Sequence, residues 1–297
     1  MTSNQAHDIV VGIDGSSGSE HALEWAIAEA SRVGCGLTLV HGLAPIPPNE
    51  RALLLSAGAA PDEVQRDARR EAVALLEGSA KQVAQREAGL QVATIVCDRD
   101  PREALTALSE NARQLVVGSR GHGPLVSLLL GSVGHGVIRT SRCPVVVVRP
   151  PSPHEPEPVP GVVAALSVLA GSRSTLAAAF VEAEARGVPV LVAFSAWDAY
   201  SAVGGWEEAG SNAPEFDALR ESLAGAVAVV SRDHPAVAVS TIVVQGAVNE
   251  SILDLSRGRD LLVVGRHGAH GLRGILGPGS NATTLVEHAH VPVMVVP

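Results

Sequence analysis

Lysine and aromatic side chains are scarce in this chain. Lys81 is the only lysine among 297 residues, aromatic residues make up 2%, and the formal net charge is −9. Proteins that bind nucleic acid place cationic side chains against phosphates and aromatic rings against bases. This composition therefore argues against a nucleic-acid partner.

Cysteines and long apolar runs are also few. Cys35, Cys97 and Cys143 are odd in number and widely spaced, which indicates reduced thiols and offers no C-x-x-C motif. No apolar run reaches the roughly 18 residues of a membrane helix. The first residues also lack the basic and apolar segments of a signal peptide. From these absences we expect a cytoplasmic protein that does not contact membranes.

Two copies of one pattern fill the sequence. TIVCDRDPREALTALSENARQLVVGSRG begins at Thr94, and TIVVQGAVNESILDLSRGRDLLVVGRHG begins at Thr241. Between the copies lies RPPSPHEPEPVPG, whose six prolines disfavour both helix and inner strand. We therefore expect one domain over residues 1–149, a proline-rich linker over 150–160 and a second domain over 161–297.

Strand and helix patterns alternate within the first copy. DIVVGID, LTLVHGL, QVATIV, QLVVG and PVVVV are runs typical of buried strands, and amphipathic segments separate them. Ser17 and Glu20 fit a capping box, and Asp100-Pro101 fits the start of a later helix. The sequence predicts an α/β fold of two tandem doubly wound domains. Each would hold a five-stranded parallel sheet, order 3-2-1-4-5, with helices on both faces.

A glycine-rich segment follows the fourth predicted strand. Gly118, Gly121 and Gly131 are spaced G-x2-G-x9-G, and Ser132 follows where a helix is expected to begin. Glycine lets a ligand approach the backbone closely. Successive N–H groups in a turn form an anion-binding nest, and the start of a helix adds further unpaired N–H groups. These features predict a phosphate site, although glycines in this position can also simply form a turn.

Other phosphate motifs fit less well. The chain has no Gly-Lys pair and therefore no P-loop. GIDGSSG carries Asp14 where a dinucleotide fingerprint has its second glycine, and a carboxylate there would repel a pyrophosphate. Asp14 suits the ribose or base of a mononucleotide instead. The alternative is that Asp14 only caps the following helix.

Together, the strand pattern, the aspartate after the first strand and the G-x2-G-x9-G-S spacing resemble the universal stress protein family, as a tandem pair over essentially the whole chain. This resemblance implies a nucleotide-binding fold, a role in stress regulation, and ATP, with or without Mg²⁺, as the ligand. It places adenosine near Asp14 and the Val40 backbone, and phosphates along the glycine-rich segment. No catalytic residue or metal ligand is expected. The expected nucleotide-binding residues are Gly12, Asp14, Val40, Gly118, Arg120, Gly121, His122, Gly131, Ser132 and Val133.

The second copy departs from this pattern. VVAALSVLAGS replaces the first strand and its aspartate, so the counterpart of Asp14 is Ser167 or Val168. Its glycine segment runs from Gly268 to either Gly277 or Gly279, and neither spacing is nine. We expect this domain to bind nucleotide weakly or not at all. The alternative is that a rearranged loop still binds.

These observations favour an ATP-binding regulatory protein with at most weak hydrolysis. The alternatives are a slow ATPase or adenylate-transferring enzyme that uses the same crevice, and a scaffold that nucleotide merely stabilises. PVVVV and PVMVV predict final strands that must be covered or paired. We expect them to meet between the domains or between chains, which gives a compact tandem or a homodimer. We also expect Gly118→Ala to abolish ATP binding and leave the fold intact.

Overall fold

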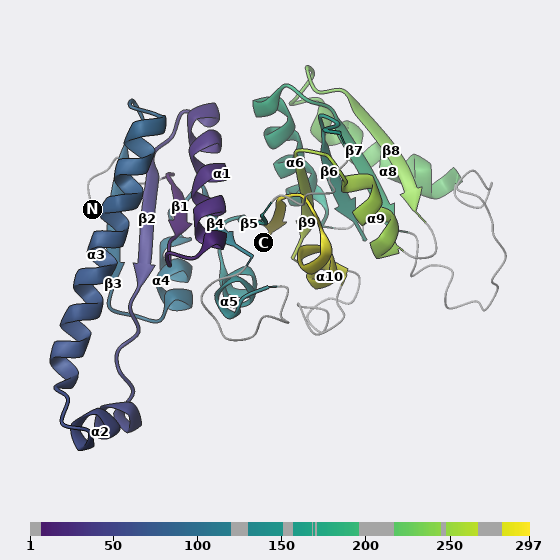
Figure 1. Cartoon of the computed structure of the whole chain (residues 1–297). Coiled ribbons are helices and arrows are strands. Elements are labelled where there is room, and N and C mark those ends of the chain that lie inside the picture. Colours follow the sequence, from purple (N-terminus) through teal and green to yellow (C-terminus); the bar gives the residue numbers. More distant parts are fainter. Residues whose placement is uncertain are drawn as a thin grey trace, which may run out of the picture. The chain divides into compact units, whose positions relative to one another are not determined.

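The computed structural model describes residues 7–119, 130–150, 157–167, 169, 171–195, 217–244, 248–266 and 281–297. The chain divides into two compact units, Met1–Pro150 and Pro151–Pro297. In each unit the described strands and helices alternate along the chain, except that two helices, α2 and α3, follow β2 in the first unit (Figure 1).

The first unit is a doubly wound α/β structure. Its five strands are all parallel, in the order β3-β2-β1-β4-β5, as the sequence predicts. The winding direction therefore reverses between β1 and β4. Its elements are β1 (Ile9–Gly12), α1 (Ser17–Val33), β2 (Leu37–Gly42), α2 (Pro48–Ser56), α3 (Pro61–Arg86), β3 (Val92–Cys97), α4 (Pro101–Leu108), β4 (Gln114–Gly118), α5 (Ser132–Thr140) and β5 (Val145–Val148).

Apolar strands at the centre of this sheet form the core. Ile9, Val11, Leu39 and Val116 are completely buried, because helices cover both faces of a parallel sheet. Burial of an apolar side chain of this size contributes roughly 1.5–3 kcal/mol. The same central strands hold their carboxyl ends in fixed positions at one edge of the sheet.

The helix starts agree only partly with the sequence pattern. Asp100 caps α4, since its side chain accepts a hydrogen bond from the Arg102 N–H. In α1 the cap is Ser16, whose hydroxyl accepts from the Ser19 N–H. The predicted capping box of Ser17 and Glu20 is therefore wrong, because the helix begins one residue earlier than that pattern requires.

The helix α2 is absent from the sequence prediction. None of its residues is buried, so it lacks the apolar periodicity by which an amphipathic helix is recognised. The next helix, α3, buries Ala72, Leu76 and Val83 and keeps its charged side chains outside. Among the described residues, no helix is long and apolar enough to cross a membrane.

The second unit repeats the doubly wound pattern. Its parallel strands follow the order β8-β7-β6-β9-β10, which matches the order in the first unit element by element. Its described elements are β6 (Val162–Leu166), α6 (Arg173–Arg186), β7 (Val190–Ser195), α8 (Asp217–Ser231), β8 (Val239–Val244), α9 (Val248–Ser256), β9 (Leu261–Gly265), α10 (Asn281–His288) and β10 (Val293–Val296).

Candidate functional site

The carboxyl ends of β1 and β4 lie side by side in the first unit, with Val11 of β1 paired to Val116 of β4. The helices α1 and α5 begin just after the chain leaves this edge, and Figure 1 shows α5 at the end of the sheet toward which the strand arrows point. We call residues 12–19, 118–119 and 130–133 the β1–β4 crest. It is the switch point at which ligands bind to doubly wound sheets.

Asp14 is exposed at this crest and is tied to the start of α1. Its Oδ1 atom accepts hydrogen bonds from the Ser16 N–H at 2.9 Å and from the Ser16 hydroxyl at 2.5 Å. Ser16 is itself the helix cap, so Asp14 does not cap the helix but orients the residue that does. This arrangement fixes the direction of an exposed carboxylate at the crest. Its contact with a nucleotide stays a prediction.

The backbone near Gly12 and Val40 belongs to the sheet. Val40 is 2% exposed, and its carbonyl oxygen accepts the Ile13 N–H at 2.8 Å. A Cβ atom added to Gly12 would lie 3.3 Å from Leu105 of α4. The structure also places His41 at this edge of the sheet, and its Nδ1 atom lies 2.8 Å from the Ile13 carbonyl oxygen. Sequence reasoning missed His41, because a lone histidine at a strand end gives no motif.

Gly118 has a structural role of its own. A Cβ atom on Gly118 would overlap the carbonyl group of Gly18, in the first turn of α1. The absence of a side chain thus lets the helix start lie directly on the end of β4. Backbone atoms would have to move in Gly118→Ala, so we expect this variant to lose stability as well as ATP affinity, and that its fold stays intact remains a prediction.

Gly131 connects the start of α5 to the end of β4. Its N–H donates to the Ser119 carbonyl at 2.9 Å, and among the described residues no side chain caps this helix. The N–H groups of the first turn, which includes Ser132 and Val133, carry the partial positive charge of a helix N-terminus. This end of the crest can accept an anion.

Three expected binding residues, Arg120, Gly121 and His122, lie outside the described residues. Their contacts with phosphate stay predictions. The structure brings together Gly12, Asp14, Val40, Gly118, Gly131, Ser132 and Val133 at the carboxyl edge of three adjacent strands, β2, β1 and β4.

Strand register identifies the counterpart of Asp14 in the second unit. Ile9 pairs with Gln114 in the first unit, and Val162 pairs with Leu261 in the second. QLVVG and LLVVG occupy the same place in the two copies. Ile9 therefore corresponds to Val162, and Asp14 corresponds to Ser167 rather than to Val168. The second unit has a neutral side chain where the first has a carboxylate.

A second difference follows β9. The Ser119 N–H donates to the Val148 carbonyl at 2.8 Å, and the Arg266 N–H donates to the Val296 carbonyl at 2.7 Å. The two residues thus occupy equivalent positions, but one is a serine and the other an arginine. Burial lowers the pKa of the Arg266 guanidinium below its ordinary value. The glycine segment from Gly268 lies outside the described residues.

Known proteins share the sequence and the fold. A sequence profile described as the universal stress protein family matches residues 6–149 and again 162–297. The chain belongs to the universal stress protein family. A universal stress protein of Mycobacterium bovis is 32% identical over 298 residues, which cover 97% of this chain and 96% of that protein.

Two further comparisons extend this result. A universal stress protein of Mycolicibacterium smegmatis is 30% identical over 294 residues, with 98% of this chain and 97% of that protein covered. The crystal structure of a universal stress protein from Archaeoglobus fulgidus matches with a TM-score of 0.68 at 18% identity, and covers 99% of this chain and 98% of that one. The tandem arrangement is thus shared by other universal stress proteins.

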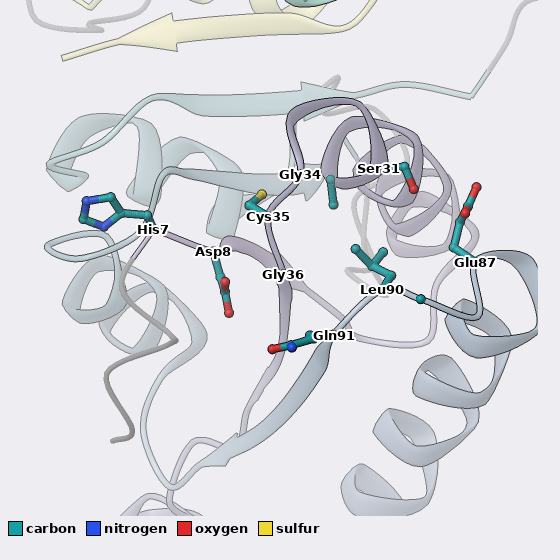
Figure 2. A pocket seen from close by; sticks show the side chains of 11 residues that line it. His7, Asp8, Ser31, Gly34, Cys35, Gly36, Glu87, Leu90 and Gln91 are labelled. Carbon is teal, nitrogen blue, oxygen red and sulfur yellow. The ribbon is translucent and has the colours of Figure 1, made fainter.

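The first unit of this universal stress protein also has a hollow of about 690 Å³ at the opposite edge of its sheet. Figure 2 shows His7, Asp8, Cys35 and Glu87 around it. The C-terminal ends of α1 and α3 also face it, and both carry partial negative charge that disfavours phosphate. Burial raises the pKa of the Cys35 thiol above its ordinary value. Within the described part of the chain, no group of three or more histidine, cysteine, aspartate or glutamate side chains is placed to hold a metal ion.

Proposed function

We propose that the first unit binds ATP at the β1–β4 crest and that this binding regulates a response to stress. The main support for this proposal is the start of α5. It has no side-chain cap among the described residues, and a hydrogen bond from Gly131 joins it to the end of β4. Asp14 holds an exposed carboxylate at the other side of the same crest. The family of the chain supports the same assignment.

The two ends of the crest suit the two ends of a nucleotide. The first turn of α5 would hold the phosphates through backbone N–H groups, and Mg²⁺, where present, would be bound by the phosphates. The Asp14 carboxylate would accept hydrogen bonds from ribose hydroxyls, and the end of β2 at Val40 would lie beside the base. The second unit lacks the carboxylate, so we propose that nucleotide binds mainly in the first.

Regulation requires that ATP bind two conformations of the protein with different affinities. We propose that the nucleotide-bound form differs in its choice of partner, that the protein acts in the cytoplasm, and that the final strands β5 and β10 take part in a homodimer or a compact tandem. Slow hydrolysis is the alternative function. It depends on Arg120, which lies outside the described residues, so no specific contact favours it.

Calorimetric titration of the full chain with ATP, comparing wild type with Asp14→Asn, tests the proposed site. Asparagine keeps an oxygen that accepts from Ser16, so the helix start should survive. We expect ATP affinity to fall about tenfold or more, since hydrogen bonds to charged groups contribute roughly 1.5–3 kcal/mol. Asp67→Asn, on the exposed side of α3, is the matched control and should bind like wild type. Wild-type protein that shows no heat of ATP binding would refute the proposal.

A further inference from the structure

Ser119 carries a buried hydroxyl that makes no hydrogen bond within the part of the chain that the structure describes. The residue is 1% exposed, and its Oγ atom has no partner among these residues. Its backbone is fully used, since the N–H donates to Val148 and the carbonyl accepts from Gly131. A buried polar group without a partner costs roughly 1–3 kcal/mol. Native proteins contain few such groups, and each needs an explanation.

Other buried serines in this unit are satisfied. Ser141 donates to the Cys143 carbonyl at 2.7 Å. Ser109 donates to the Thr106 carbonyl at 2.6 Å and accepts from the Arg142 N–H at 3.0 Å. Both are as buried as Ser119. The difference is that these two lie at the far edge of the sheet, away from the crest.

Strand alternation places the Ser119 side chain on the α4 side of the sheet. A Cβ atom on Gly12 would lie 3.6 Å from Val117 and 3.3 Å from Leu105 of α4, so Val117 faces that helix. Gly118 faces α1 on the other side. Side chains two residues apart share a face. Ser119 therefore shares the face of Val117.

The helix α5 lies on this same face. Thr140 of α5 is hydrogen-bonded to Thr106 of α4, with 2.6 Å between the two hydroxyl oxygens. The bond from Gly131 to the Ser119 carbonyl places the start of α5 next to Ser119. An uncapped helix start and an unpartnered hydroxyl thus meet at one point of the crest.

We propose that the Ser119 hydroxyl donates a hydrogen bond to a phosphate group of the nucleotide held at the first turn of α5. This inference rests on the proposed ATP site and names a residue outside the expected binding set. The hydroxyl gains its missing partner only when phosphate is bound.

The test compares wild type and Ser119→Ala in the full chain, with unfolding temperature measured without nucleotide and affinities measured by calorimetry. Removal of an unpartnered hydroxyl should leave the unfolding temperature unchanged or raise it. ATP affinity should fall about tenfold. Adenosine, which has no phosphate, should bind both proteins equally. Ser109→Ala is the matched control, and it should lower the unfolding temperature without changing ATP affinity.

The outcomes separate this inference from the proposed function. ATP that binds wild type and Ser119→Ala equally would refute the role of Ser119 and leave the proposed site standing. An equal loss for ATP and adenosine would refute the phosphate contact. A lower unfolding temperature for Ser119→Ala would show that the hydroxyl has a partner within the protein. Wild type that binds no ATP would overturn both proposals.

Discussion

Single residues at the carboxyl edge combine structural roles with proposed binding roles. Gly118 is the clearest case. The sequence motif predicts that it binds phosphate, and the structure shows that it lies directly against Gly18. Asp14 likewise supports the cap of α1 while its carboxylate remains exposed. A loss of binding after substitution is therefore informative only when stability is measured in the same variant.

At this scale, we expect Gly118→Ala to lower the free energy of unfolding by about 1–3 kcal/mol, the usual cost of overpacking. Chemical denaturation of the ligand-free protein measures this. Gly78→Ala is the matched control, since a Cβ atom there meets no neighbour, and alanine in α3 should stabilise the helix slightly. A Gly118→Ala protein as stable as wild type would contradict the packing role of this glycine.

The cap of α4 makes a pH-dependent contribution. The hydrogen bond from Arg102 holds the pKa of Asp100 below its ordinary value of 3.8. A lowered folded-state pKa gives stability that is complete above pH 3.8 and disappears as pH falls through the folded-state value. Arg102→Gln should therefore destabilise the protein at pH 7, by about 0.5 kcal/mol for so exposed a pair.

Urea denaturation at pH 7 and near pH 2 provides the measurement. The difference between wild type and Arg102→Gln should shrink at the lower pH, because Asp100 loses its charge as pH falls through its folded-state pKa. A difference that is equal at both pH values would show that Arg102 acts through packing against Gly136 rather than through Asp100.

At the scale of elements, a strand or helix can be predicted from the sequence to the extent that its residues are buried. Strands such as β4 and β5 are buried on both faces and read as continuous apolar runs, so their positions and their order could be predicted from the sequence. The helix α2 buries nothing, and its residues carry no periodic signal. The cap of α1 was misplaced by one residue because SSGS offers three serines, and only backbone geometry selects Ser16.

The contrast between α1 and α2 gives a prediction at the scale of elements. Leu53 of α2 is 68% exposed and Leu23 of α1 is 1% exposed. Leu53→Ala should change the free energy of unfolding by less than about 0.5 kcal/mol. Leu23→Ala should cost about 2–5 kcal/mol. Equal effects in denaturation experiments would mean that α2 packs more tightly than its exposure indicates.

The candidate site is less predictable than the fold. Glycine spacing and Asp14 predict where the proposed ligand would bind, because both depend on backbone shape near a strand end. The unpartnered hydroxyl of Ser119 could not be predicted, since serines after strands are common and only the structure shows which of them lack partners. Likewise, the choice between Ser167 and Val168 needed the strand register.

Across the whole molecule, the two units share a strand order and differ in the charged residues that follow their equivalent strands. A carboxylate stands after β1 in the first unit, and the second unit has Ser167 after β6 and Arg266 after β9. The two copies of the fold thus share a sheet and differ at its carboxyl edge.

We therefore expect each chain to bind about one ATP molecule. Calorimetry of the full chain gives this stoichiometry directly, and Asp14→Asn should reduce the affinity of that single site. Ser167→Ala, the equivalent change in the second unit, serves as the control and should leave binding unchanged. Two sites of equal affinity would show that the rearranged second loop still holds nucleotide.

Because Gly118 has no side chain, the first turn of α1 lies directly against the end of β4 at Gly18. At about 1.5 Å per residue, the 17 residues of α1 extend roughly 25 Å from this contact. The far tip ends at Gly34, on the rim of the hollow beside Cys35. The helix α1 therefore joins the two margins of the sheet, with its start at the β1–β4 crest and its end at the hollow.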